Sequence, residues 1–285
     1  MVFTIALAQI DSKLGDLRNN ISNHAECVRR ARKKGADLIV FPELSLSGYA
    51  IRDMNWEIAL RLPARDTLGE LLRLSKDISI ILGAVEESSE YGIFNSAFLL
   101  EQGKAVSIHR KIYPPTYGMF EESRYFSPGK TIRSFESSVG RLGVLICEDL
   151  WHLPLPYVLA EDDAQVIITL AASPTRLAGK TKRAAIAQVN TEHHKAYARL
   201  LSSYVVFCNR VGYDDGVNFW GGSEVIDPSG NIVVQAKLFE EDLVLANIND
   251  NEVRRARRLS RHFLDDDERL VINELERITR RKRSL

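Results

Sequence analysis

Three segments of the sequence carry side chains that could act together on a carbonyl group. Glu43 follows an apolar stretch at 37–41 and a proline, Lys111 precedes a long loop at 112–130, and Cys147 ends an apolar run at 141–146. Taken singly, each has an ordinary interpretation: a solvated loop acid, a surface basic residue and a small buried thiol. Together they supply a carboxylate, an ammonium group and a thiol, and this combination indicates chemistry.

These three groups suffice to hydrolyse an amide through a covalent intermediate. A thiolate attacks the carbonyl carbon after a carboxylate takes the thiol proton. A neighbouring ammonium group stabilises the oxyanion that forms. The protonated carboxylate then donates to the leaving ammonia, and the same carboxylate activates water to release the acyl group. Such a site needs neither histidine nor a metal ion, so we expect no cofactor and no metal.

Apolar runs of strand length alternate with helical patterns along the chain. Late in the sequence, three short strands around a turn at 227–230 suggest a β-meander. This order predicts a mixed α/β fold with helices on the sheet faces, in one domain at 1–250 followed by a charged helical tail at 251–285. The expected strands lie at 2–10, 37–41, 79–85, 94–100, 105–110, 141–146, 165–172, 204–209, 224–226, 232–235 and 243–249, and the expected helices at 19–34, 67–76, 154–161 and 180–201.

The composition argues against several classes of protein. Lys and Arg together number 38, as do Asp and Glu, so no net charge favours nucleic acid or a membrane surface. Basic residues in the tail are interleaved with acids, which favours an oligomer contact over a nucleic-acid arm. Three cysteines cannot make a full disulfide framework, which is typical of the cytoplasm. The apolar N-terminus is too short to span a membrane and predicts a first strand rather than a signal peptide.

Taken together, the three segments resemble the nitrilase (carbon–nitrogen hydrolase) superfamily from about residue 3 to about residue 249. Its marks are a Phe-Pro-Glu-x-x-x-x-Gly-Tyr stretch, a lysine before a proline-containing loop and a cysteine at a strand end, and all occur here in that order. The resemblance implies a four-layer α-β-β-α sandwich. It also implies Glu43 as general base, Lys111 as oxyanion stabiliser and Cys147 as nucleophile. Glu122 matches a fourth acid that orients the lysine and substrate, and the N–H of Glu148 a second oxyanion donor.

A closer likeness is to the glutaminase domain of glutamine-dependent NAD synthetases. The segments that carry it are Cys-Glu-Asp-Leu-Trp at 147–151, Tyr-Gly-Met-Phe-Glu-Glu-Ser-Arg-Tyr-Phe at 117–126, Ala-Ala-Ser-Pro at 171–174 and Asn-Arg-Val-Gly at 209–212. In those enzymes a synthetase half carries a Ser-Gly-Gly-x-Asp-Ser ATP-binding loop, which is absent here, so we expect a stand-alone domain. True nitrilases usually have Cys-Trp-Glu at the nucleophile, and Glu148 in place of that Trp favours amides over nitriles.

The likeness also implies a set of substrate-binding residues. An amino-acid substrate needs a cation for its carboxylate, and among Lys180, Lys182 and Arg183 the last is the best positional match. Glu148 and Arg183 would then clamp the two charges of a glutamine-like ligand. The implied substrate-binding residues are Tyr49, Tyr117, Glu148, Trp151, Ser173 and Arg183.

The sequence therefore predicts an amidase that cleaves a small carboxamide through a cysteine thioester and releases ammonia. The expected partners are the amide, water and a second copy in a homodimer or larger homo-oligomer. Alternatives are a glutaminase subunit for a separate synthetase, a nitrilase or N-carbamoyl amidohydrolase, and a non-catalytic binding subunit. His193 and His194 are adjacent on an expected helix and point to different faces, so core or surface roles are favoured over metal binding.

Overall fold

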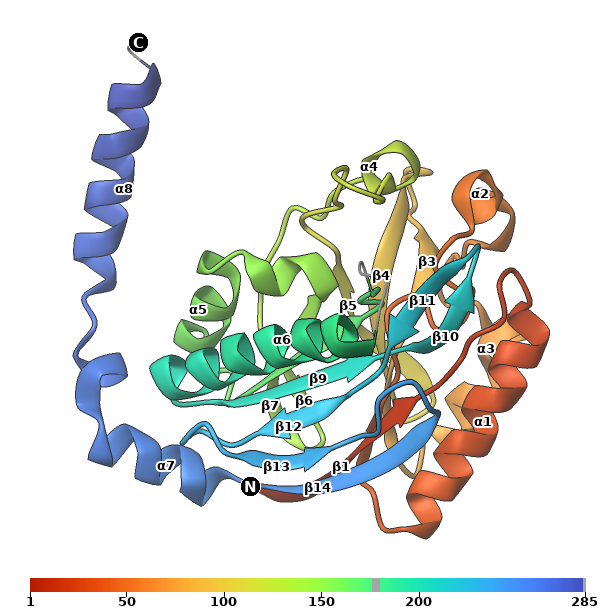
Figure 1. The fold of residues 1–285 in the computed structure, drawn as a ribbon, viewed down its shortest axis with the longest axis horizontal. Coiled ribbons are helices and arrows are strands. Elements are labelled where there is room, and N and C mark those ends of the chain that lie inside the picture. Colours follow the sequence, from red (N-terminus) through yellow and green to blue (C-terminus); the bar gives the residue numbers. More distant parts are fainter. Residues whose placement is uncertain (176–179, 284–285) are drawn as a thin grey trace.

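The computed structural model describes residues 1–175 and 180–283, and the side chains of 180–184 are outside this description. Two six-stranded sheets pack face to face, and helices cover their outer faces (Figure 1). This is the α-β-β-α sandwich that the resemblance implied. The strands alternate with helices in the chain, so the same order that predicted a mixed α/β fold also provides the helical outer layers.

The first sheet has the strand order β14-β1-β2-β3-β4-β5. Strands β1, β2 and β3 run parallel, whereas β14, β4 and β5 pair antiparallel with their neighbours. Helices α1 and α3 pack on its outer face through apolar side chains such as Val28 and Leu71. The bounds are β1 Val2–Gln9, α1 Leu17–Lys33, β2 Leu38–Val40, α3 Arg65–Leu74, β3 Ser79–Glu87, β4 Ile93–Glu101, β5 Lys104–Arg110 and β14 Asp242–Asn249.

The second sheet has the strand order β13-β12-β9-β8-β7-β6, with β7, β8 and β9 parallel. Helices α5 and α6 cover its outer face, where Leu155 and Leu159 of α5 pack against Leu145 and Ile167. The bounds are β6 Phe135–Ser137, β7 Gly140–Ile146, α5 Pro154–Glu161, β8 Val166–Ala171, α6 Lys180–Leu201, β9 Tyr204–Asn209, β12 Glu224–Ile226 and β13 Ile232–Gln235.

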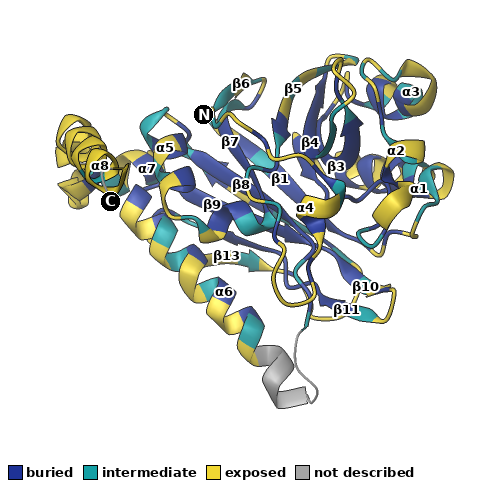
Figure 2. Ribbon diagram, turned by 90° about the horizontal axis from the view of Figure 1, so that it is seen from above, coloured by how far each residue is buried: buried dark blue, intermediate teal, exposed yellow. Residues whose placement is uncertain are grey.

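The main core lies between the two sheets. Leu7 and Val40 of the first sheet pack against Ile146, Ile168 and Val206 of the second, and all five are buried. The strands of both sheets are largely buried (Figure 2). Because the central parallel strands are covered on both faces, they are almost continuously apolar, and polar residues are concentrated at their carboxyl ends. The same geometry brings the carboxyl ends of β2 and β7 to one side of the molecule, and Glu43 and Cys147 follow these strands.

The expected β-meander is wrong. Strands β12 and β13 pair with each other, but β14 leaves them and pairs antiparallel with β1 over Val2–Gln9 in the other sheet. Local sequence could not reveal this pairing because it joins the two ends of the domain. The expectation also lacked several short elements: 3-10 helix η1 Arg52–Met54, α2 Asn55–Ile58, α4 Glu122–Tyr125, 3-10 helix η2 Cys147–Trp151, and the hairpin β10 Val211–Asp214 and β11 Val217–Trp220.

The chain continues beyond β14 in three helical segments: α7 Asp250–Leu259, 3-10 helix η3 Arg261–Asp265 and α8 Glu268–Arg283. Helix α8 projects away from the sandwich, and its surface is exposed on all sides (Figures 1 and 2). None of the helices in the described ranges combines the length and apolar character that a membrane crossing requires.

Candidate active site

The structure brings Glu43, Lys111 and Glu122 together in the interior. The Lys111 Nζ lies 2.7 Å from Glu43 Oε1 and 2.7 Å from Glu122 Oε1. All three side chains are at least 95% buried. Burying charge is costly unless each charge has a partner. The surrounding chain must therefore hold the two carboxylates in place beside the buried ammonium group.

Strand β4 supplies part of that arrangement through Asn95. Its Nδ2 donates to Glu43 Oε1 at 2.8 Å, and its backbone carbonyl accepts the backbone N–H of Lys111 at 2.9 Å. The other carboxylate oxygen of Glu43 accepts the N–H of Ala172 at 2.9 Å. The Tyr49 hydroxyl donates at 2.5 Å to Glu122 Oε1, the same oxygen that accepts from Lys111 Nζ.

Cys147 lies directly after β7, at the first position of the short helix η2. Its φ is +45°, a left-handed conformation that costs a non-glycine residue about 1–3 kcal/mol and is found most often at functional sites. This turn from strand to helix presents the thiol at the end of the sheet. The N–H of Ala172 donates to Glu43 Oε2. The same N–H lowers the pKa of the Cys147 thiol, so the acid and the thiol share a neighbour.

The electrostatics of the site favour a neutral thiol and a charged lysine. Burial, followed by the negative charge of Glu43, raises the pKa of Cys147 well above its ordinary value, against the opposing effect of Lys111. Burial alone lowers the pKa of Lys111, but the charges of Glu122 and Glu43 outweigh it and leave that pKa well above its ordinary value. Burial likewise raises the pKa of Glu122 to about 7, although Lys111 opposes the shift.

Asp149 joins the segment that carries the thiol to the segment that carries the lysine. Its Oδ1 accepts the N–H groups of Ile112 and Tyr113, each at 3.0 Å, and these residues directly follow Lys111. Its Oδ2 accepts the N–H of Ile146 at 3.1 Å and lies 3.1 Å from the Nε2 of His109. The fully buried carboxylate thus fixes the two chain segments relative to each other.

Residues 4–258 match the family model of the carbon-nitrogen hydrolases. The chain belongs to the carbon–nitrogen hydrolase family. Membership makes it a hydrolase of carbon–nitrogen bonds other than peptide bonds. Its sandwich is the fold of the family's solved members, including Nit3 of Saccharomyces cerevisiae, which superposes with a TM-score of 0.79 at 24% identity over 91% of this chain and 94% of that one.

Two curated relatives of this hydrolase are glutamine-dependent NAD(+) synthetases. That of Acinetobacter baylyi is 33% identical over 252 residues, covering 88% of this chain and 45% of that protein. That of Thermotoga maritima is 31% identical over 253 residues, covering 87% and 42%. A solved glutamine-dependent NAD+ synthetase from Acinetobacter baumannii matches with a TM-score of 0.76 at 31% identity, covering 89% of this chain and 47% of that one. The hydrolase thus spans less than half the length of these relatives.

The described substrate-binding residues expected from the sequence occupy three places in the hydrolase. Trp151 and Ser173 line a pocket together with Cys147. Glu148 follows the thiol, and its Oε2 accepts the hydroxyl of Tyr117 at 2.8 Å. The Tyr49 hydroxyl donates to Glu122.

The substrate-binding role expected for Arg183 concerns a side chain outside the described residues. Helix α6 begins at Lys180, so Lys180, Lys182 and Arg183 lie in its first turns, but their side chains are outside the described residues. In the described part of the chain, no group of three or more His, Cys, Asp or Glu side chains is placed to hold a metal ion.

Several residues of the site could not be identified from sequence spacing. Asn95 is a polar residue within a buried strand, and this break in the apolar pattern is the one local sign of its role. Asp149 was part of the acidic stretch after the thiol, but its partners at 112–113 are distant in the chain. Asn190, His194 and Phe207 line the thiol pocket from α6 and β9, and nothing near them in the sequence relates them to Cys147.

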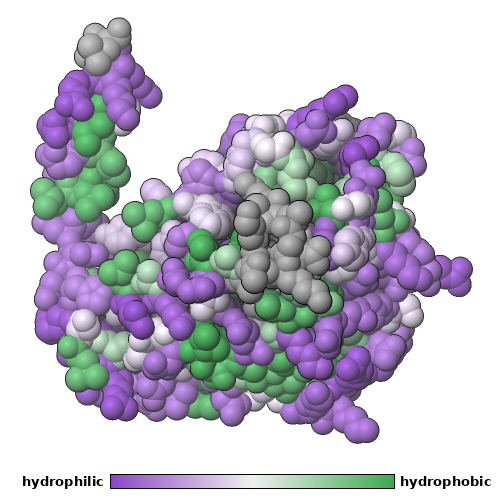
Figure 3. Space-filling view, in the orientation of Figure 1, coloured by the Kyte–Doolittle hydropathy of each residue, from purple (hydrophilic) through white to green (hydrophobic). Residues whose placement is uncertain are grey.

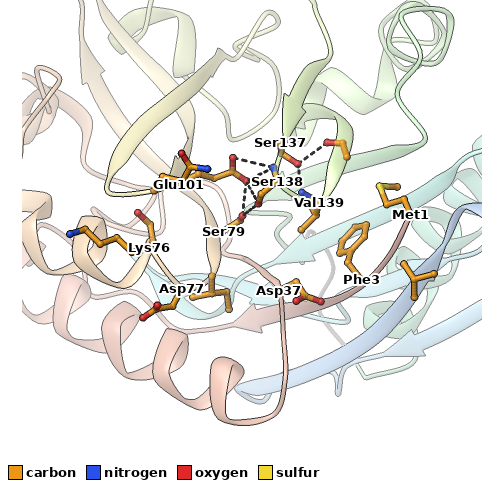
Figure 4. Close-up of a pocket in the computed structure, with 15 residues that line it drawn as sticks. Met1, Phe3, Asp37, Lys76, Asp77, Ser79, Glu101, Ser137, Ser138 and Val139 are labelled. Atoms are coloured by element: carbon orange, nitrogen blue, oxygen red, sulfur yellow. Dashed lines mark hydrogen bonds between the residues drawn. The ribbon is translucent and has the colours of Figure 1, made fainter.

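A larger cavity lies at the opposite ends of the strands, away from the thiol (Figure 4). Glu101 is buried there and its Oε1 accepts the hydroxyls of Ser79 at 2.6 Å and Ser138 at 3.0 Å. Ser138 belongs to the turn between β6 and β7, whereas Glu101 ends β4, so these bonds connect the two sheets. The buried carboxylate of Glu101 is thus satisfied by serines of both sheets, which indicates a structural role.

Proposed function

We propose that the hydrolase is an amidase that cleaves a small carboxamide through a thioester on Cys147 and releases ammonia. The observation that carries the proposal is the Lys111 ammonium held at 2.7 Å from both Glu43 and Glu122, beside a thiol at a strained strand end. This site combines a buried acid-base group, a buried positive charge and a partly exposed nucleophile, as acyl transfer requires.

In the first half-reaction, Glu43 takes the proton of the Cys147 thiol as sulfur attacks the carbonyl carbon. The raised pKa of the thiol means that this proton must be removed during the attack, which is the task of a general base. The carbonyl oxygen becomes an oxyanion, and the Lys111 ammonium stabilises it together with the N–H of Glu148. When the C–N bond breaks, Glu43 returns the proton to the leaving nitrogen, and ammonia departs.

In the second half-reaction, Glu43 takes a proton from water, whose oxygen attacks the thioester carbon. The C–S bond breaks, the sulfur regains the proton from Glu43, and the carboxylic acid leaves. The bonds from Asn95 and Ala172 hold Glu43 for both steps. Glu122 positions Lys111, and its own orientation is fixed by Tyr49.

Ammonia release from a panel of compounds tests this proposal. The panel consists of glutamine, asparagine, other ω-amides, aliphatic amides, N-carbamoyl compounds and nitriles, each assayed beside Cys147→Ala. We expect at least one primary amide to be hydrolysed and Cys147→Ala to lose that activity by about three orders of magnitude or more. Turnover of nitriles alone, or equal rates in both proteins, would refute the amidase.

A second candidate is a glutaminase that supplies ammonia to a separate synthetase. It is supported by the names of the relatives, which are glutamine-dependent NAD(+) synthetases of which this chain spans less than half. We expect glutamine hydrolysis to rise when an ammonia-dependent NAD synthetase and its substrates are added. An unchanged rate with glutamine, beside steady turnover of other amides, would favour the free-standing amidase.

A further inference from the structure

A buried ion pair spans strand β10, and the proposed catalytic steps do not use it. Hydrophilic residues cover much of the molecular surface (Figure 3), and most charged side chains of the described residues are on that surface. Arg210 and Asp214 are exceptions: they are 1% and 4% exposed, and Nη1 of the arginine lies 2.6 Å from Oδ2 of the acid. A buried ion pair adds little net stability, because desolvation offsets the attraction between its charges. Its effect is therefore expected in the geometry of the groups that it holds.

The guanidinium group of Arg210 is fixed by several contacts. Its Nη2 donates to the carboxylate of Asp11 and to the carbonyl of Ser12, each at 3.1 Å. Its central carbon lies 4.5 Å from the centre of the Phe219 ring, which belongs to β11, the other strand of the hairpin. A planar guanidinium group stacks on an aromatic ring while its edges form hydrogen bonds. Arg210 thus joins the hairpin to the loop after β1 and presents a fixed donor to Asp214.

Asp214 holds the segment that contains Tyr49. The Asp214 oxygen that pairs with Arg210 also accepts the N–H of Tyr49 at 2.7 Å and that of Ala50 at 3.3 Å. Phe219 contacts the ring of Tyr49 edge-on, with 5.8 Å between the ring centres. The backbone and the ring of Tyr49 are therefore both placed by the hairpin.

The hydroxyl of Tyr49 reaches the catalytic cluster. It donates at 2.5 Å to Glu122 Oε1, and the same oxygen accepts from Lys111 Nζ at 2.7 Å. The other oxygen of Glu122 is buried and has no hydrogen-bond partner among the described residues. The two bonds of Oε1 therefore orient this carboxylate. A displaced Tyr49 would let Glu122 move, and with it the ammonium group that stabilises the oxyanion.

The main chain of Arg210 contacts the opposite carboxylate of the cluster. Its N–H donates to the carbonyl of Ala171 at 3.1 Å. The N–H of the same peptide group, which is that of Ala172, donates to Glu43 Oε2 at 2.9 Å. Arg210 thus reaches Glu43 through its main chain and Glu122 through its side-chain contacts. The two carboxylates that flank the lysine share one support.

We propose that the ion pair of Arg210 and Asp214 positions the Lys111 ammonium group for catalysis. Asp214 acts through Tyr49 and Glu122 rather than on the reacting atoms, which makes it a positioning residue. This inference rests on the proposed amidase function and deepens it. The ammonium group is needed most when the oxyanion forms, so loss of the pair should lower kcat and leave KM nearly unchanged.

Asp214→Ala removes the acceptor of the Tyr49 N–H and leaves Arg210 its bond to Asp11. With an amide of the panel, we expect kcat to fall about tenfold or more and KM to change less than about threefold. Asp214→Asn keeps an oxygen that can accept the N–H and should recover most of the rate. The control is Asp215→Ala, because Asp215 is the next residue and also pairs with an arginine, Arg52, but is half-exposed. This control should leave kcat nearly unchanged.

A double-mutant cycle with Tyr49→Phe separates positioning from a purely structural role. Tyr49→Phe removes the hydroxyl that binds Glu122, so an effect of Asp214 that passes through this hydroxyl has nothing left to act on. We expect Asp214→Ala to lower kcat less than about threefold in this background. The same loss in both backgrounds would overturn the proposal, as would a normal kcat in Asp214→Ala or a loss confined to KM.

Urea unfolding shows whether Asp214→Ala is folded under the assay conditions. If it is not, Phe219→Leu takes its place in the cycle, because this change removes the ring that contacts both Arg210 and Tyr49. A loss of kcat that is equal with and without the Tyr49 hydroxyl would overturn the proposal there too, while amide hydrolysis by the wild-type enzyme stands. A wild-type protein that cleaves no amide of the panel would instead overturn the proposed function, and this inference with it.

Discussion

The carboxylate of Asp149 accepts the backbone N–H of Ile112 at 3.0 Å. This bond links the residue two positions after the thiol to the residue directly after the lysine. A side chain with no part in the proposed chemical steps thus sets the distance between nucleophile and ammonium. In Asp149→Asn, the side-chain NH2 group would face backbone N–H groups, and two donors cannot form a hydrogen bond with each other. We expect this change to cost about 1–3 kcal/mol of stability.

The kinetic effect of Asp149→Asn follows from the same geometry. Misplacement of a catalytic group by about 1 Å can reduce rates about a hundredfold, so kcat should fall by about 10–100-fold while KM changes little. Steady-state kinetics with an amide from the panel, with urea unfolding in parallel, measure both effects. A variant with reduced stability but normal kcat would show that the link does not position the site.

Glu43→Gln tests whether the thiol depends on a base. Because burial and the charge of Glu43 raise the pKa of Cys147, the resting sulfur is a thiol, and its reaction requires removal of a proton. In the wild-type protein we expect iodoacetamide to alkylate Cys147 faster than Cys27 or Cys208, because the latter two are buried. Glu43→Gln should slow the alkylation of Cys147 by about tenfold or more. Peptide mass spectrometry provides the rates for all three cysteines. An unchanged or faster rate in Glu43→Gln would show that alkylation of Cys147 does not depend on proton removal by Glu43.

The raised pKa of Glu122 should make the stability of the folded protein depend on pH. Its pKa rises from the ordinary 4.5 to about 7 in the folded protein, chiefly through burial. Between these values the folded protein keeps a proton that the unfolded chain releases, so this carboxyl lowers stability as pH rises from about 4.5 and has no further effect above about 7. The loss is about 3 kcal/mol at most, because one pKa unit corresponds to about 1.4 kcal/mol.

Glu122→Gln should remove that dependence. The free energy of unfolding of the variant relative to wild type should increase between pH 5 and pH 8, and denaturant titrations at these two values measure it. Glu121→Gln, at the neighbouring exposed position, is the control and should show no comparable trend. A difference that is constant with pH would mean that Glu122 is not protonated in the folded state near neutrality.

Strand β3 approaches the segment that carries Glu43 most closely at Gly83, where the structure leaves no room for a Cβ. A Cβ at this position in β3 would lie 2.4 Å from the Leu44 N and 2.5 Å from the Pro42 O, the residues on either side of Glu43. Gly83→Ala must therefore displace the segment that carries Glu43. We expect a stability loss of about 1–3 kcal/mol and a fall in kcat. Gly69→Ala, where a Cβ meets nothing within 4 Å, is the control and should retain full activity. Normal kinetics in Gly83→Ala would show that the segment can move without consequence.

The sequence predicted the mixed α/β fold for identifiable reasons. Most residues of the strands at 141–146 and 204–209 are apolar, and α5 and α6 begin and end where their patterns do, so local periodicity was sufficient there. Glu43, Lys111 and Cys147 each follow an expected strand, but it was the resemblance to the nitrilase superfamily, and no single segment, that selected them as the proposed catalytic residues. The pairing of β14 with β1 was not predictable in this way, because no local pattern specifies a partner at the other end of the chain.

Tertiary structure alone decided the surroundings of the site. The contact of Asn95 with Glu43, the link from Asp149 to the segment after Lys111, and the pair of His194 with Glu224 each join residues 30 to 52 positions apart. Sequence spacing could describe His194 only as one of two adjacent histidines on different helix faces. Its position in the thiol pocket depends on how α6 packs over the second sheet, because side-chain neighbours across layers are set by packing of whole elements and not by local spacing.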